Sequence, residues 1–206
     1  MQYGKSLKYV FHVIVHPFDG FWDLKHEKRG SLAAALTFVA LTIFTLTIEK
    51  QKTGFLFNPN RLEEIDVLVD VFTVILLYVL WCVANWCLTS LMDGEGKFRD
   101  ILISTGYALF PIVLIRLPLI PISHLITSAE GSFYNVFGIV SYIWAGALLI
   151  LGTMITHGYS MKKTILTCIL SIVGMAIIMF IGLLFFDIIQ RMVTFVSTIY
   201  KEVRFR

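Results

Sequence analysis

Long apolar stretches dominate the chain, and short polar connections separate them. Five such stretches occupy residues 32–48, 71–91, 101–117, 133–156 and 165–186, and only the third contains a charged residue, Arg116. A helix needs about 20 residues to cross roughly 30 Å of hydrocarbon, where charged side chains are costly. The pattern therefore predicts five transmembrane helices, because helices satisfy their own backbone hydrogen bonds in lipid.

Apolar positions also recur at helical spacing at both ends of the chain. At the N-terminal end they are Leu7, Val10, Phe11, Ile14, Val15 and Phe18, and at the C-terminal end Met192, Phe195, Val196, Ile199 and Val203. We expect a short amphipathic helix interrupted at Pro17 and a helical continuation of the last span. The expected fold is an all-α polytopic membrane protein. It divides into an amphipathic interfacial segment (1–30), a five-helix transmembrane bundle (31–189) and an amphipathic tail (190–206).

Composition agrees with a membrane protein, since 57% of the residues are hydrophobic and 15% are charged. Positive charges favour the cytoplasmic side of short connections. Nine lie on the side of the N-terminus: Lys5, Lys8, Lys25, Lys28, Arg29, Lys97, Arg99, Lys162 and Lys163. The opposite connections carry Lys50, Lys52 and Arg61 with an acidic cluster of Glu63, Glu64, Asp66 and Asp70. This asymmetry predicts a cytoplasmic N-terminus and, with five spans, a C-terminus outside.

An aromatic element precedes the first span and contains Pro17, Phe18, Phe21 and Trp22. Aromatic rings are suited to the headgroup level of a bilayer. We interpret the element as an anchor in the inner leaflet. It serves either orientation alone or, alternatively, as a docking surface for a partner.

The third span contains Arg116 shortly before Pro118 and Pro121. Proline disfavours helix at the preceding residue, so the span is expected to end near Leu117. Arg116 would then lie at the outer boundary and extend to the headgroups. The alternative pairs Arg116 with Asp187, which the same topology places near the outer end of the fifth span.

Other candidate residues are intramembrane polar or structural. Asn85 is expected to find a partner on a neighbouring helix, with a substrate or ion site as the alternative. Gly106 allows a neighbouring helix to approach closely, and Pro111 frees a backbone carbonyl within the span. We therefore expect a bent third helix and a compact bundle in which the third and fourth spans are central.

Signatures of catalysis are absent from the sequence, which lacks an HExxH, a GxSxG and a phosphate-binding glycine loop. The connection 92–100 lacks the length and the terminal Glu of a calcium loop. The three cysteines all fall within apolar stretches. We predict no enzyme, no cofactor and no metal site.

Several of these features together resemble the Yip1 family. They are the glycine-rich turn 93–96 with Phe98 behind it, the run Gly106-Tyr107-x-Leu109-x-Pro111, and five spans with the N-terminus inside. The element Pro17-Phe18-x-x-Phe21-Trp22 is similar to the opening of bacterial members. The resemblance implies a polytopic protein that is not an enzyme. Eukaryotic relatives act in vesicle traffic and contact small Ras-like GTPases through a long N-terminal region, of which this chain has only about 30 residues. The compact form implies a prokaryotic plasma membrane.

Two functions remain open at this point. The first is a scaffold or accessory subunit for other membrane proteins, or an organiser of the bilayer. The second is a small permease or channel component with a polar path near Arg116 and Asn85. The expected partners are the lipid bilayer and other integral membrane proteins, with a homo-oligomer as an alternative and no nucleic acid.

Overall fold

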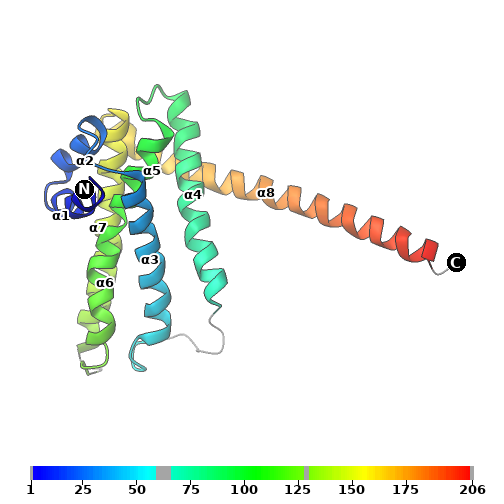
Figure 1. Ribbon diagram of the computed structural model, residues 1–206, viewed down its shortest axis with the longest axis horizontal. Helices are drawn as coiled ribbons and strands as arrows, with labels where there is room; N and C mark the ends of the chain where they lie inside the picture. The colour runs from blue at the N-terminus through cyan, green and yellow to red at the C-terminus, as the bar shows by residue number, and fades with distance from the viewer. Residues whose placement is uncertain (1, 59–65, 128–129, 205–206) are drawn as a thin grey trace.

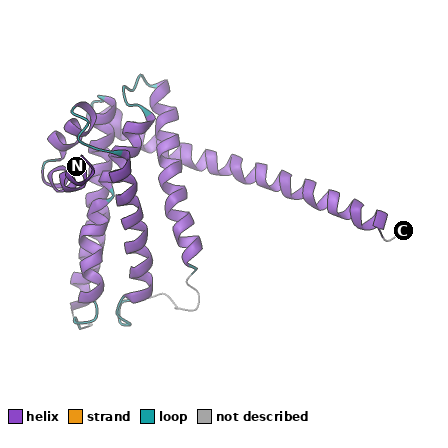
Figure 2. Ribbon diagram, in the orientation of Figure 1, coloured by secondary structure: helices purple, strands orange, loops and turns teal. Residues whose placement is uncertain are grey.

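The protein is described here by a computed structural model that covers residues 2–58, 66–127 and 130–204, without the side chains of Gln2 and Val203. Across these ranges every regular element is a helix (Figure 1, Figure 2). Arg61, Glu63 and Glu64, whose charges entered the topology prediction, lie outside the described residues.

Two short helices precede the first span. They are α1 (Gln2–Val15) and α2 (Pro17–His26). The interruption between them falls at His16, because Pro17 lacks a backbone N–H and fits the first turn of α2. The amphipathic N-terminal helix predicted from the sequence is confirmed. The two helices pack closely, since a Cβ atom on Gly20 would lie 2.7 Å from the Cα atom of Val13.

Five helical segments are long and apolar enough to cross a membrane, as predicted. They are α3 (Leu32–Lys52), α4 (Val67–Leu91), α5 (Phe98–Ala108) continued by α6 (Phe110–Ile122), α7 (Gly131–His157) and α8 (Met161–Arg204). Side chains cap the starts of α3 and α4. The Ser31 hydroxyl accepts a hydrogen bond from the backbone N–H of Ala34, and the Asp66 carboxylate accepts from Leu68 and Val69.

The third span is divided at Leu109, which confirms the predicted bend at Pro111. Its predicted end near Leu117 is wrong. Helix α6 continues through Pro118 and Pro121 to Ile122, and both prolines are exposed on its surface. Prolines are tolerated within transmembrane helices where neighbouring groups satisfy the freed carbonyls. The hydroxyl of Ser123 supports the end of α6 by donating to the carbonyl of Ile120 at 2.6 Å.

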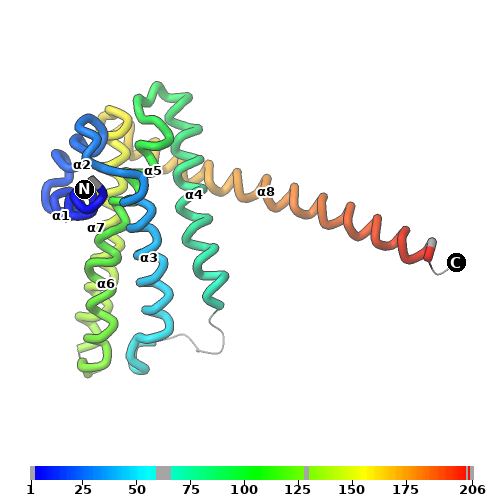
Figure 3. The backbone as a smooth tube through the Cα atoms, in the orientation of Figure 1, coloured from blue at the N-terminus to red at the C-terminus, as the bar shows by residue number. Residues whose placement is uncertain are grey.

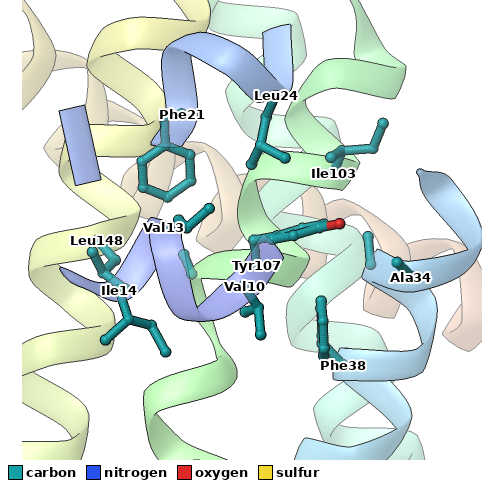
Figure 4. Packing of buried hydrophobic residues seen from close by; sticks show 12 residues of the cluster. Val10, Val13, Ile14, Phe21, Leu24, Ala34, Phe38, Ile103, Tyr107 and Leu148 are labelled. Carbon is teal, nitrogen blue, oxygen red and sulfur yellow. The ribbon is translucent and has the colours of Figure 1, made fainter. Parts of the chain in front are cut away.

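A buried apolar cluster joins the N-terminal helices to the spans (Figure 4). Val10, Val13 and Phe21 from α1 and α2 contact this cluster together with Phe38 of α3 and Tyr107 of α5. The remaining members are Ile14, Leu24, Ala34, Ala35, Ile103, Ala108 and Leu148. Helices α1 and α2 are therefore packed against the bundle rather than separate from it.

The fifth apolar helix leaves the bundle crosswise to the other spans (Figure 1, Figure 3). Only its first third packs on α4, through buried Thr164, Thr167, Cys168 and Ser171. The prediction of a compact bundle holds for the first four spans and not for most of α8. We call the end of the bundle that carries α1 and α2 the proximal end, and the opposite end the distal end.

Candidate functional site

Arg116 lies on α6 in the distal half of the bundle and bonds to two other spans. Its Nη1 atom donates to both carboxylate oxygens of Glu49 on α3, each at 2.6 Å. Its Nε atom donates to the Ser141 hydroxyl at 3.0 Å, and its Nη2 atom to the Gly138 carbonyl at 3.2 Å, both on α7. The guanidinium carbon lies 4.0 Å from the ring centroid of Tyr142. We call these five residues the Arg116 cluster.

The alternative pair of Arg116 with Asp187 is not formed. Asp187 instead accepts a hydrogen bond from Arg191 one turn later on α8, at 2.8 Å, and both side chains are exposed. Arg116 and Glu49 are only 13% and 19% exposed. The partner differs because α3 extends as a helix past its apolar run and carries Glu49 to the level of Arg116. Arg116 therefore neither extends freely to the headgroups nor contacts α8.

A cleft of about 680 Å³ opens beside the Arg116 cluster at the distal end. Its wall also carries an ion pair between Lys50 and Asp70 at 2.6 Å, and the rings of Phe57 and Tyr134 stack at 5.1 Å between centroids. The charges of its two ion pairs cancel. Such a lining suits a neutral or zwitterionic amphiphile, and it holds no nucleophile paired with a base among the described residues.

Asn85 lies on α4 in the proximal half and is fully buried. Its Oδ1 atom is 3.0 Å from Nε2 of His157 on α7, and its Nδ2 atom donates to the Ser171 hydroxyl on α8 at 3.5 Å. The expected partner on a neighbouring helix is confirmed. Because a side-chain amide oxygen only accepts, His157 carries its proton on Nε2 in this arrangement.

The other ring nitrogen of His157 faces the glycine-rich turn. Nδ1 is buried without a hydrogen-bond partner among the described atoms. A Cβ atom on Gly94 would lie 2.7 Å from this nitrogen, and one on Gly96 would lie 2.8 Å from Cε1 of the same ring. Glycine is thus required at both positions by the approach of the ring, a reason that the sequence alone did not reveal.

Tyr159 covers the same histidine from the connection between α7 and α8. Its ring stacks on His157 at 5.5 Å between centroids, and its hydroxyl donates to the Met92 carbonyl at 3.0 Å. Burial and the nearby carboxylate of Asp93 raise the pKa of Tyr159, so the phenol stays protonated as a donor. These contacts tie together the proximal ends of α4, α7 and α8.

Gly106, Tyr107 and Pro111 have structural positions within the third span. A Cβ atom on Gly106 would lie 2.8 Å from the Cβ of Ala35, which shows the close approach of α3 and α5 expected from the sequence. The buried Tyr107 hydroxyl donates to the backbone carbonyl of Ser6 at 2.9 Å. Tyr107 thereby bonds α1 to the middle of the bundle.

The four residues of the aromatic element separate into two groups. Phe18 and Trp22 are exposed on α2, where they can meet headgroups as expected. Phe21 is 1% exposed and packs in the core, close to Gly152 of α7, so its expected place at the lipid surface is wrong. Successive residues of a short helix face different directions, and Phe21 lies on the face of α2 that covers the bundle. Pro17 is half-buried at the start of the helix.

The residues that sequence reasoning missed as partners are Glu49 and His157. A signal existed for Glu49, because a carboxylate that directly follows the first apolar run stands at the same membrane level as Arg116 near the end of the third. His157 likewise directly follows the fourth apolar run. Asn85 lies within the second run, so the sequence does not show that the two residues are at the same level. That depends on how α4 and α7 pack side by side.

These helices and buried polar clusters define a polytopic helical membrane protein. A model of the Yip1 domain matches residues 11–193, and the chain belongs to this family. No curated protein and no solved structure matches the chain significantly. The resemblance read from the sequence is confirmed.

Proposed function

We propose that this Yip1 domain protein is a non-enzymatic accessory subunit that holds other integral membrane proteins in the bilayer. The observation that carries the proposal is the exposed surface of α8. This helix has 44 residues and is therefore about 66 Å long, whereas about 30 Å suffices to cross the hydrocarbon. Only 6% of the apolar stretch of α8 that could cross a membrane is buried, whereas the buried share is 28–56% for the corresponding stretches of the other spans.

The exposed surface of α8 consists of large apolar side chains with a glycine, Gly182, among them. From residue 179 to residue 202 every described side chain is exposed, including Phe180, Phe185 and Phe195. A Cβ atom on Gly182 would meet nothing within 4 Å. Small residues allow the backbone of a second helix to approach within a membrane. A transmembrane helix of another protein fits this surface, since the apolar part of α8 requires either lipid or protein around it.

A photo-crosslinking residue at Phe185 tests the proposal in native membranes, with the same residue at exposed Trp144 of α7 as the control. We expect a product from position 185 that contains one defined membrane protein and that is lost in Gly182→Ile. Gly146→Ile is the matched substitution, because a Cβ atom there also meets nothing within 4 Å. A product of about twice 23.4 kDa would indicate a homo-oligomer, and crosslinks to lipid alone would also contradict the proposal.

We further propose that the proximal end faces the cytoplasm and that the C-terminus lies outside. The nine lysines and arginines counted from the sequence support this orientation. A Ser197→Cys variant in a Cys87→Ala background should react with an impermeant maleimide from outside intact cells. Reaction only after permeabilisation would place the C-terminus inside.

Transport has less support than assembly. The Arg116 cluster and the Asn85–His157 pair lie at different levels of the bundle, because on α7 the buried Leu148 separates Ser141 from His157. A permease needs polar groups that converge on one path. The distal cleft reaches Arg116, and Asn85 is not among the residues that line it.

A further inference from the structure

A second cleft, of about 940 Å³, lies at the proximal end among three separate segments. The first wall is α1, with Lys5, Ser6 and Tyr9. The second is the end of α2 with the segment 27–31, and the third is the turn before α5 with the first residues of that helix. We call this the proximal cleft. Its walls come from parts of the chain far apart in sequence, so its lining is a product of the fold.

The lining carries more positive than negative side chains. Its six cations are Lys5, Lys25, Lys28, Arg29, Lys97 and Arg99, and its three carboxylates are Glu27, Glu95 and Asp100. Each carboxylate already has a partner, as shown by the contacts Lys25–Glu95 at 2.9 Å, Arg29–Glu27 at 2.5 Å and the backbone N–H of Lys97 to Asp100 at 3.2 Å. The hydrogen bond from Lys25 lowers the pKa of Glu95, which keeps this carboxylate ionised.

Four cations of the cleft have no such partner. In the described part of the chain no carboxylate lies within 4 Å of Lys5, Lys28, Lys97 or Arg99. Like charges that converge in a cleft repel one another and concentrate a positive field. An anion bound between these cations would relieve the repulsion. Charges that only need solvation can be spread over a flat surface, whereas these four line the same cleft.

The segment between α2 and α3 is held in a fixed conformation at the edge of the cleft. Lys28 has a φ of 52°, a left-handed conformation that costs a residue with a side chain about 1–2 kcal/mol. The Ser6 hydroxyl donates to the Arg29 carbonyl at 2.7 Å, and Tyr107 in turn donates to the carbonyl of Ser6. These contacts attach the backbone that carries Lys28 and Arg29 to the core. The backbone at Lys28 is therefore in place before any ligand arrives, and the exposed side chains of Lys5, Lys28, Lys97 and Arg99 remain accessible to it.

We propose that the proximal cleft binds an anionic phosphate group, with Lys5, Lys28, Lys97 and Arg99 as its counter-charges. Lysine and arginine are the side chains that proteins use for phosphate, through charge-assisted hydrogen bonds. The volume exceeds that of a single phosphate ion and accommodates a phosphate ester. Exposed Phe18 and Trp22 on α2 belong to the same proximal end, which places the cleft near the headgroup level. The phosphate comes either from an anionic phospholipid headgroup or from a soluble phosphate compound.

The test measures binding of dihexanoyl phosphatidylglycerol to the purified full-length protein in a neutral detergent, by intrinsic tryptophan fluorescence. Dihexanoyl phosphatidylcholine serves as the zwitterionic comparison. The double variant Lys5→Gln/Arg99→Gln removes one cation from each of two walls. The control Lys8→Gln/Lys162→Gln removes the same total charge from exposed positions that do not line the cleft.

We expect saturable binding of the anionic lipid that weakens about tenfold in the cleft variant and less than about twofold in the control. Equal weakening in both variants, equal affinity for the zwitterionic lipid, or no saturable binding of either anion would overturn the proposal. Inorganic pyrophosphate distinguishes the source. Competition at micromolar pyrophosphate supports a soluble ligand, and binding of the lipid without such competition supports a headgroup. Size-exclusion profiles matching the wild type confirm that both variants are folded.

Discussion

The ion pair between Arg116 and Glu49 gives the sharpest test of the structure. Glu49→Gln keeps the shape of the side chain and removes its charge. Breaking a buried pair costs about 3–5 kcal/mol, and an exposed pair contributes about 0–1 kcal/mol. Arg116 and Glu49 are 13% and 19% exposed, and Arg116 keeps its contacts with Ser141 and Gly138. We therefore expect a loss of about 2–4 kcal/mol in the free energy of unfolding.

A double substitution separates the charge from the packing. The double variant Glu49→Leu/Arg116→Met lacks both charges. The two α7 groups that bonded to Arg116 still bond to each other, because the Ser141 hydroxyl donates to the Gly138 carbonyl at 2.7 Å. No polar group on α7 then loses its only partner. Replacing both members of a buried pair by apolar groups is often nearly neutral, so we expect the double variant to recover to within about 1 kcal/mol of the wild type.

The assay is reversible unfolding of the full-length protein in mixed micelles with increasing dodecyl sulfate, followed by tryptophan fluorescence. Asp187→Asn is the matched control, because it removes an exposed i, i+4 pair on α8 and should cost less than about 0.5 kcal/mol. The reasoning fails if Glu49→Gln costs no more than Asp187→Asn. It fails equally if the double variant is no more stable than Glu49→Gln.

Three other outcomes follow from close contacts in the bundle. Gly106→Ala should cost about 1–3 kcal/mol in the same assay, because its methyl group would overlap α3, whereas Gly182→Ala should be close to neutral. Asn85→Leu leaves the Nε2 proton of His157 buried without an acceptor and should cost about 1–3 kcal/mol, with no such loss contradicting the described pair. The lowered pKa of Glu95 means that its ion pair stabilises the proximal turn above the ordinary carboxyl pKa. As the pH falls through the lowered value that stabilisation is lost. The protection of the backbone amides of residues 93–97 against hydrogen exchange, taken relative to their intrinsic exchange rates at each pH, should then fall, and unchanged protection would contradict the pair.

The spans and the bend were predictable because their causes are local. Apolar length alone fixes which segments cross hydrocarbon, and Pro111 lacks the N–H that would continue α5. The same rule failed at Pro118, because a helix in a bundle can continue through a proline when its surroundings satisfy the carbonyls. Local sequence gives the tendency to break, and packing decides whether the break occurs.

The partners of the polar residues were not predictable in the same manner. Arg116 could have met Asp187 or Glu49, since both follow apolar runs at comparable levels. The choice depends on which helices adjoin α6, and α6 packs against α3 and α7. The composition of α8 also does not predict that the helix leaves the bundle. The same apolar residues are stable against lipid, against another protein and in the chain's own core.

The bond from Tyr107 to Ser6 has a consequence for how the molecule is made. Helices α1 and α2 leave the ribosome first, yet Tyr107 on the third span and Leu148 on the fourth, which complete their packing, are synthesised much later. The inner face of the N-terminal helices must therefore wait at the membrane surface while the first four spans are inserted. Completion of the fourth span, rather than insertion of the first, is the event that lets the N-terminus of this protein take its final place.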